Sequence, residues 1–180
     1  MLFRSGMASN YGNLGMIYRT KGDLAKAEDM HNKSLEISKK LGRLQGMARQ
    51  YGNLGLIYRV RGDLDQAEDM HNKSLEINKK LGRLEGMAAE YGDLGIVYKK
   101  RGDLDKSEEM YLKSLEISEP LEMLELTANQ YGNLGLIYEK LGDIGKAKKY
   151  LEKALELYKK IGMPHKVKKW QGLIEGIDTE

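Results

Sequence analysis

Histidine is the side chain best suited to bind a metal ion or to transfer protons near neutral pH, and this chain has three: His31, His71 and His165. The first two occupy the same position in nearly identical stretches forty residues apart. A metal site would also need carboxylate or thiolate ligands converging from neighbouring turns, and neither a cysteine nor an HExxH motif occurs. We therefore interpret His31 and His71 as packing residues, and we expect no metal site and no cofactor.

Acidic residues recur in pairs, but nothing positions one of them as a base beside a nucleophile. The pairs are spaced by forty residues: Glu28-Asp29, Glu68-Asp69 and Glu108-Glu109. This pattern indicates a solvated helix face. The glycines lack the strand, turn and lysine of a phosphate-binding loop. Because no set of catalytic roles can be assembled, we expect that the chain is not an enzyme.

Composition and charge narrow the classes of partner. The 30 basic and 27 acidic residues are interspersed, so no block of one sign marks a nucleic-acid arm or a polybasic membrane anchor. The absence of cysteine fits a reducing compartment. No run of eighteen apolar residues occurs, and the N-terminal MLFRSGMASN lacks the apolar core of a secretory signal. We expect a cytoplasmic protein with no nucleic-acid partner and no membrane partner.

A forty-residue repeat must position these residues. The octapeptide YGNLGMIY and its close variants recur at Tyr11, Tyr51, Tyr91 and Tyr131. Residues 7–46 and 47–86 differ at only nine of forty aligned positions. A period of this length predicts stacked units within one domain spanning residues 1–180. We place the units at about 7–46, 47–86, 87–126 and 127–163.

Each unit contains two helical patterns separated by a turn. Tyr11, Leu14 and Tyr18 recur at intervals of three and four residues, which predicts one face of an amphipathic helix, here called helix A. Gly22-Asp23 follows: glycine suits the left-handed position after a helix, and aspartate can cap helix B, which begins at Leu24. Glycines such as Gly15 weaken a helix, so we expect close helix packing there. Residues 164–177 predict a final helix that caps the last hairpin.

These positions carry a family resemblance. The pattern of tetratricopeptide repeats is similar to the residues that recur here every forty positions: Tyr11, Leu14, Gly15, Tyr18, Gly22, Asp23, Ala27 and Leu35. The asparagine-leucine-glycine triplet resembles the long-repeat branch that includes kinesin light chains, spindle-orientation adaptors and many bacterial and archaeal solenoid proteins. The resemblance implies an all-α fold, a right-handed α-solenoid of four helix-turn-helix repeats plus a C-terminal capping helix. Pro120, in the stretch EPLEMLEL, predicts an altered junction between the third and fourth units.

The resemblance also implies a peptide-binding surface on the side of the A helices opposite the B helices. At the offsets that family members use, this A-helix surface comprises Asn13, Met16, Arg19, Arg49, Asn53, Leu56, Arg59, Asp93, Ile96, Lys99, Lys100, Asn129, Asn133, Leu136 and Lys140. Asn13, Asn53 and Asn133 would hold an extended peptide backbone, because a carboxamide both donates and accepts hydrogen bonds. The glycines of helix A would let the peptide approach closely: Gly12, Gly52, Gly92 and Gly132. Alternatively, the asparagines bond to neighbouring helices and the glycines ease helix packing.

Charge on this surface selects among partners. Arginines and lysines outnumber Asp93 and Glu139 there, which favours an acidic or carboxylate-bearing peptide. The carboxylate clamp of chaperone-tail-binding members is not expected, because Gly12 and Met16 occupy its lysine and asparagine positions. We therefore predict a protein-interaction scaffold that binds an extended or amphipathic acidic peptide. The alternative is a structural or self-assembling array that stacks end to end without a dedicated ligand.

Overall fold

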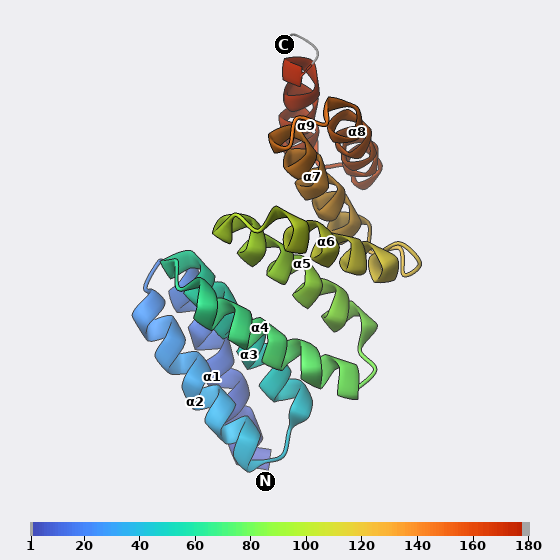
Figure 1. The fold of residues 1–180 in the computed structure, drawn as a ribbon. Helices are drawn as coiled ribbons and strands as arrows, with labels where there is room; N and C mark the ends of the chain where they lie inside the picture. Colours follow the sequence, from blue (N-terminus) through green and yellow to red (C-terminus); the bar gives the residue numbers. More distant parts are fainter. Residues whose placement is uncertain (1, 178–180) are drawn as a thin grey trace. The chain divides into compact units, whose positions relative to one another are not determined.

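Helical hairpins make up the chain in the computed structural model, which describes residues 2–177 and the side chains from residue 6 onward. The helices are, in order, α1 (Leu2–Thr20), α2 (Leu24–Lys40), α3 (Leu44–Arg61), α4 (Leu64–Lys80), α5 (Leu84–Arg101), α6 (Leu104–Ser118), α7 (Leu124–Lys140), α8 (Ile144–Ile161) and α9 (Pro164–Ile177). Short turns join them, so that α1 lies beside α2, α3 beside α4 and α7 beside α8 (Figure 1). Residues 2–177 contain no strand, and the all-α prediction is confirmed. Within the same range, no helix combines the length and apolarity needed to cross a bilayer.

The turns from helix A to helix B use the predicted glycine-aspartate pair. Gly22 has a φ of +81°, in the left-handed region that glycine adopts without steric cost. The Asp23 side chain then accepts a hydrogen bond from the Lys26 backbone N–H at 3.1 Å and caps α2. Asp103 and Asp143 cap α6 and α8 in the same way. These turns therefore fix where the B helices begin.

The turns from helix B to the next helix A also place one residue in the left-handed region. This residue is Gly42 after α2 and Gly82 after α4, with φ values of +63° and +62°. At the junction near Pro120, α6 ends at Ser118 and Glu122 takes the left-handed position with a φ of +51°. A side chain in this conformation costs about 1–2 kcal/mol. The altered junction therefore keeps the turn geometry while losing the glycine that suits it.

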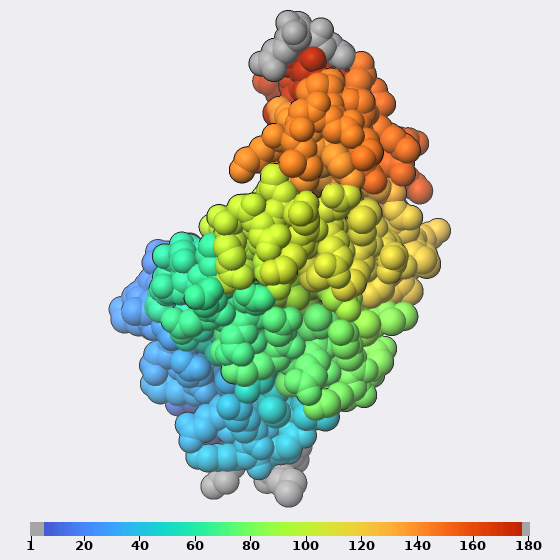
Figure 2. Space-filling model, viewed as in Figure 1, coloured from blue at the N-terminus to red at the C-terminus, as the bar shows by residue number. Residues whose placement is uncertain are grey.

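Two compact units divide the chain within α5: unit 1 ends at Asp93 and unit 2 begins at Leu94. In unit 1, Leu54 and Ile57 of α3 are at most 2% exposed, and on the face shown in Figure 2 side chains fill the spaces between the ribbons. In unit 2, Trp170 of α9 stacks on Tyr158 of α8 with ring centroids 6.4 Å apart. Each unit therefore has its own core, and the assignment of residues 1–180 to a single domain stays a prediction.

A glycine of helix A meets a larger side chain of helix B in each hairpin, a contact that we call a glycine socket. The pairs are Gly15 with His31, Gly55 with His71, Gly95 with Tyr111, and Gly135 with Leu151. A Cβ at Gly55 would lie 2.6 Å from the His71 ring, which is closer than carbon atoms pack. The expected close approach at these glycines is confirmed, and the partner is helix B of the same hairpin.

Helix B is also bonded to the next helix A through acidic residues. The Tyr58 hydroxyl of α3 donates to Glu28 of α2 at 2.6 Å, and Arg61 donates to the same carboxylate at 2.5 Å. Burial, together with the hydrogen bond to Glu28, raises the pKa of Tyr58 to about 12. Tyr138 of α7 donates likewise to Glu108 of α6. The prediction of a solvated face is therefore wrong for Glu28 and Glu108, which connect successive hairpins.

Candidate peptide-binding surface

The predicted surface residues of unit 1 lie on α1, α3 and the first part of α5. Asn13, Met16 and Arg49 are exposed, and Met16 leaves 45% of its surface accessible. The others are partly buried: Arg19, Asn53, Leu56, Arg59 and Asp93. Their spacing of three or four residues places them on one stripe of each helix. None of these residues is sealed in the core of unit 1, so a ligand can reach the stripe.

In unit 2 the predicted residues lie on the second part of α5 and on α7. The polar ones are exposed or partly buried: Lys99, Lys100, Asn129, Asn133 and Lys140. Ile96 packs against the apolar cluster around Tyr111, and Leu136 packs against the cluster around Leu151. These two apolar side chains therefore stabilise the core as well as border the surface.

Polar side chains of this surface bond to the next A helix within each unit. In unit 1, Arg59 Nη2 of α3 lies 3.6 Å from Asp93 Oδ1 of α5. In unit 2, Lys99 Nζ of α5 donates to Asn133 Oδ1 of α7 at 2.7 Å. Because lysine cannot accept a hydrogen bond, this contact fixes the Asn133 oxygen toward Lys99 and leaves its N–H groups as donors. The interpretation in which asparagines bond to neighbouring helices therefore applies to Asn133.

Asn129 contacts a B helix. Its Oδ1 accepts a hydrogen bond from the Tyr158 hydroxyl of α8 at 2.6 Å. Burial raises the pKa of Tyr158, so this hydroxyl stays protonated and able to donate. The contact uses the carbonyl oxygen of the Asn129 carboxamide. A role of its NH2 group in peptide binding stays a prediction.

The repeated glycines at the start of the octapeptide pack against the following A helix within each unit. A Cβ at Gly12 would lie 3.3 Å from Gln50 Nε2. A Cβ at Gly52 would lie 2.7 Å from Glu90 Oε1, and a Cβ at Gly132 would lie 2.5 Å from the Trp170 ring. The prediction that Gly12, Gly52 and Gly132 let a peptide approach is therefore wrong, because side chains of the protein already occupy that space.

A polar hollow of about 720 Å³ lies in unit 1 beside α1 and the starts of α3 and α5. Among the residues whose side chains the structure describes, three arginines line it, Arg43, Arg49 and Arg83, and the one acidic lining residue is Glu90. The described lining of this arginine hollow therefore carries more positive than negative charge. Of the three arginines only Arg49 was predicted, although the Gly-Arg-Leu triplet that follows each of the first two B helices marks the other two.

Both repeated histidines are fully buried, as the packing interpretation requires. His31 Nδ1 lies 2.9 Å from Gln50 Oε1, and His71 Nδ1 lies 2.7 Å from Glu90 Oε2. Burial lowers the pKa of His31. The partners Gln50 and Glu90 were not predicted from the sequence. They are polar residues at the same position of successive repeats, and this recurrence could have indicated a shared role.

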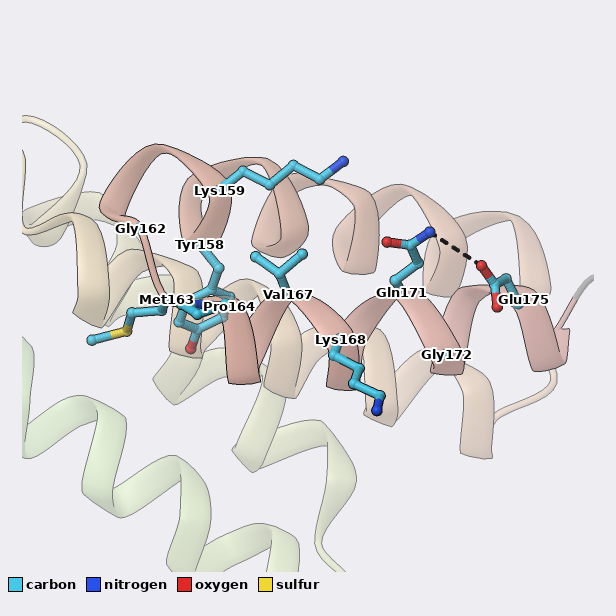
Figure 3. Close-up of a pocket in the computed structure, with 10 residues that line it drawn as sticks. All are labelled: Tyr158, Lys159, Gly162, Met163, Pro164, Val167, Lys168, Gln171, Gly172 and Glu175. Atoms are coloured by element: carbon cyan, nitrogen blue, oxygen red, sulfur yellow. Dashed lines mark hydrogen bonds between the residues drawn. The ribbon is translucent and has the colours of Figure 1, made fainter.

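A second hollow, of about 660 Å³, lies in unit 2 between the end of α8 and α9 (Figure 3). Tyr158 and Val167 are among its apolar lining residues, whereas Gln171 donates to Glu175 at 3.2 Å along α9. Glu175 stands forty residues after Gly135, the glycine that admits α8 onto α7. On α7 this face is covered by α8. The corresponding face of α9 is polar, as a capping helix requires.

Comparison with known proteins identifies the repeat. The family model "Tetratricopeptide repeat" matches residues 6–80 and 86–160. Among solved structures, aspartyl phosphate phosphatase F from Bacillus subtilis has a TM-score of 0.89 at 15% identity, over 93% of this chain and 44% of that one. The apo form of RapI has a TM-score of 0.85 at 18% identity, over 96% and 63%. BtubC (BKLC) from P. vanneervenii has a TM-score of 0.75 at 20% identity, over 98% and 81%.

No curated protein matches the sequence. This chain spans less than two thirds of the length of RapI and of phosphatase F. At sequence identities of 20% or below, these similarities show a shared fold and nothing about a shared function. That fold is the predicted α-solenoid of helical hairpins. Since the family model covers most of the residues, the chain belongs to the tetratricopeptide repeat family.

Proposed function

We propose that this chain binds a carboxylate-bearing, extended peptide in the arginine hollow of unit 1. Membership of the tetratricopeptide repeat family supports binding of a protein partner, because this repeat is a protein-interaction module. The proposal that the bound peptide bears carboxylates rests on the lining of the hollow, where Arg43, Arg49 and Arg83 outnumber Glu90. A carboxylate is the complementary group for such a lining.

The electrostatics of the hollow favour an anion. The Glu90 carboxylate is already engaged by His71 and by Ser74 Oγ, which donates to it at 2.7 Å. Arginine binds carboxylates through two parallel hydrogen bonds, which are shorter and stronger than neutral ones. Arg49 and Asn53 are four residues apart on α3 and share one face. A peptide anchored at Arg49 would therefore reach the carboxamide of Asn53, which can bond to its backbone.

Reversal of one charge in the hollow tests the proposal. We expect Arg49→Glu to weaken binding of a fluorescein-labelled, glutamate-rich peptide by about tenfold, because a lost charge pair and a new repulsion together cost about 1.4 kcal/mol or more. Fluorescence anisotropy measures the affinity. Binding by the parent protein should also weaken as NaCl is added, since salt screens these charges.

Two controls separate this effect from net charge. Lys21→Glu changes the net charge equally in the turn after α1, outside the hollow, and should leave binding unchanged. A peptide with lysine in place of each glutamate should not bind. Equal affinity of the parent and Arg49→Glu for the acidic peptide, or equal binding of both peptides, would contradict the proposal.

Self-association is a second candidate, because α1 exposes an apolar face that a later A helix buries. Leu14 and Ile17 are 40% and 49% exposed. Their counterparts Leu134 and Ile137 on α7 pack against Tyr111 of the preceding helix B. We propose that a second copy of the chain covers the exposed face of α1 with its own Leu14 and Ile17. Association would bury this apolar area, which is a favourable contribution.

Sedimentation velocity at increasing protein concentration measures self-association. The parent should form dimers, and the double variant Leu14→Ser/Ile17→Ser should stay monomeric. Val60→Ser is the matched control, because Val60 of α3 is 59% exposed and lies outside the α1 face. A parent protein that is monomeric at every concentration would contradict self-association through α1 and would leave the peptide proposal unaffected.

A further inference from the structure

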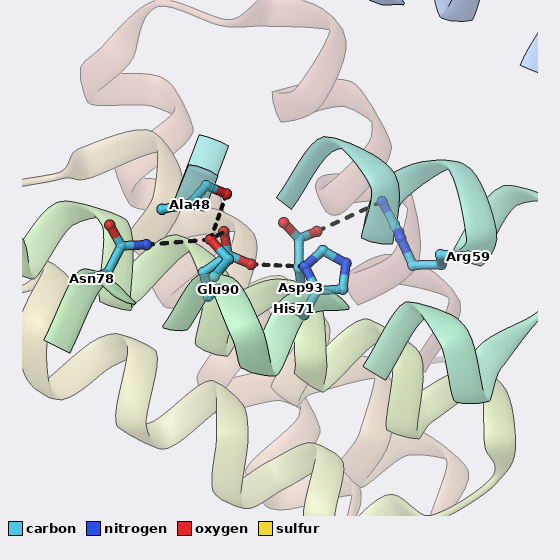
Figure 4. Close-up of polar contacts among 7 residues, drawn as sticks. Ala48, Arg59, His71, Asn78, Glu90 and Asp93 are labelled. Carbon is cyan, nitrogen blue, oxygen red and sulfur yellow. Dashed lines mark hydrogen bonds and ion pairs between the residues drawn. The ribbon is translucent and has the colours of Figure 1, made fainter. Parts of the chain in front are cut away.

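A histidine of α4 and two carboxylates of α5 converge in unit 1 (Figure 4). Glu90 and Asp93 are three residues apart, so both extend from one side of α5. One nitrogen or oxygen atom from each of His71, Glu90 and Asp93 lies within 4.8 Å of the other two. The closest pair is His71 Nδ1 with Glu90 Oε2, at 2.7 Å. We call this group the His71 cluster.

The preceding hairpin contains the same arrangement without the acids. His31 has the position of His71, but the amide residues Gln50 and Asn53 stand where the His71 cluster has its carboxylates. His31 is nevertheless fully buried, and its Nδ1 is bonded to Gln50 Oε1 at 2.9 Å. Neutral amides are thus sufficient for packing a buried imidazole at this position. The two acids of the His71 cluster are not required by the fold.

One of the two carboxylates of the His71 cluster, that of Asp93, is paired with a guanidinium. Arg59 Nη2 lies 3.6 Å from Asp93 Oδ1, and Arg19 acts on Asp93 only from farther away. Ser74 Oγ donates to Glu90 at 2.7 Å without adding charge. Glu90 and Asp93 thus bring two carboxylates into one small, largely buried group. The cluster would therefore be stabilised by a further cation.

We propose that His71, Glu90 and Asp93 bind one divalent transition-metal ion, with zinc as the best match. One imidazole and two carboxylates are ligands that Zn²⁺ and Co²⁺ accept, and three protein ligands with an open fourth position are a recurrent zinc geometry. Metal–ligand distances of about 2.0–2.2 Å place ligand atoms roughly 3–4 Å apart. The three side chains need only a small rotation to reach that spacing from their separations of up to 4.8 Å.

The environment of the cluster allows an ion to enter and to be held. The side chains of Glu90 and Asp93 are 12% and 27% exposed, which leaves room for a water ligand. The ion would bind the unprotonated Nδ1 of a neutral His71 ring that carries its proton on Nε2, in place of the present contact between Nδ1 and Glu90. Coordination would then join α4 directly to α5. The inference does not depend on the peptide proposal, although Glu90 also lines the arginine hollow.

Titration of the tag-free protein with Co²⁺ tests the inference. We expect one equivalent of Co²⁺ to produce visible d–d absorption, and Zn²⁺ to abolish this absorption by competition. Zn²⁺ should also raise the melting temperature, because a ligand of the folded state stabilises it. The double variant Glu90→Gln/Asp93→Asn should bind Co²⁺ at least about tenfold more weakly, since outer-shell partners alone are worth that much. His165→Gln, which removes an exposed histidine, should change nothing.

The first hairpin supplies matched controls. The variant Glu90→Gln/Asp93→Asn recreates the amide environment of that hairpin, so its circular dichroism spectrum should equal that of the parent. The converse variant Gln50→Glu/Asn53→Asp should bind a second equivalent of Co²⁺, and failure to do so would count against the inference. A parent protein with neither Co²⁺ absorption nor a Zn²⁺-dependent melting shift would overturn it. Unchanged Co²⁺ affinity in Glu90→Gln/Asp93→Asn would overturn it as well.

Discussion

Gly55→Ala is expected to lower the free energy of unfolding by about 1–3 kcal/mol, although alanine has the higher helix propensity. The added Cβ would lie 2.6, 2.7 and 2.8 Å from Nε2, Cδ2 and Cε1 of the His71 ring. His71 is fully buried, and its Nδ1 is bonded to Glu90. The ring therefore cannot move aside without losing that hydrogen bond. Urea denaturation followed by far-UV circular dichroism measures the free energy.

Other glycines of the chain serve as controls for Gly55→Ala. Gly12→Ala should cost far less than Gly55→Ala, because the nearest atom, Gln50 Nε2, would lie 3.3 Å from the added Cβ and would have to shift by only a few tenths of an ångström. Gly172→Ala meets no heavy atom within 4 Å and should stabilise α9 by about 0.5–1 kcal/mol. Gly132, which faces the Trp170 ring, should behave like Gly55. If Gly55→Ala were as stable as Gly172→Ala, steric exclusion would not explain the glycine sockets.

Trp170→Ala is expected to destabilise unit 2 by about 3–5 kcal/mol, the usual cost of removing a buried tryptophan. Trp170 is 4% exposed, stacks on Tyr158 and belongs to the same buried cluster as Leu151 and Ala154. Its ring also covers Gly132 of α7. Truncation would leave a cavity where α7, α8 and α9 meet, and Trp170 is the one buried residue of α9.

Differential scanning calorimetry is the suitable measurement for Trp170→Ala, because the chain has a single tryptophan and the variant loses its fluorescence. Lys169→Ala is the neighbouring control. Its ammonium lies 4.5 Å from the centroid of the Trp170 ring at the surface, and an exposed cation–π contact is worth about 0.5–1 kcal/mol. A melting temperature of Trp170→Ala equal to that of the parent would show that α9 is not part of the core of unit 2.

Local chemistry made most of the fold predictable. α2 begins at Leu24 and α9 spans Pro164–Ile177, as expected from the turn residues and from the helical spacing. Both signals act over a few residues, so they can be read without knowing the partners of a side chain. The glycine sockets were predictable for a similar reason. A helix-weakening residue that recurs at a fixed interval must be offset by packing.

Contacts across helices were less predictable, because they depend on which side chains meet over long sequence separations. Lys99 and Asn133 are thirty-four residues apart, and nothing local to either residue indicates the other. Glu28 was expected in solvent for the same reason, since its partner Tyr58 lies on the next hairpin. The arginine hollow depends on turns and helix starts that are distant in sequence, so only Arg49 was found. Peptide binding by the A-helix surface stays a prediction.

The glycine sockets bear on how such repeats diverge after duplication. An imidazole, a phenol and an isobutyl group fill the same space above a glycine in successive hairpins of this chain. A Cβ on the glycine would lie 2.5–2.6 Å from the filling group in each hairpin, so the closeness of this contact does not depend on the polarity of that group. Copies of one hairpin can therefore gain or lose an ionisable interior group, one at a time, and keep the same glycine contact.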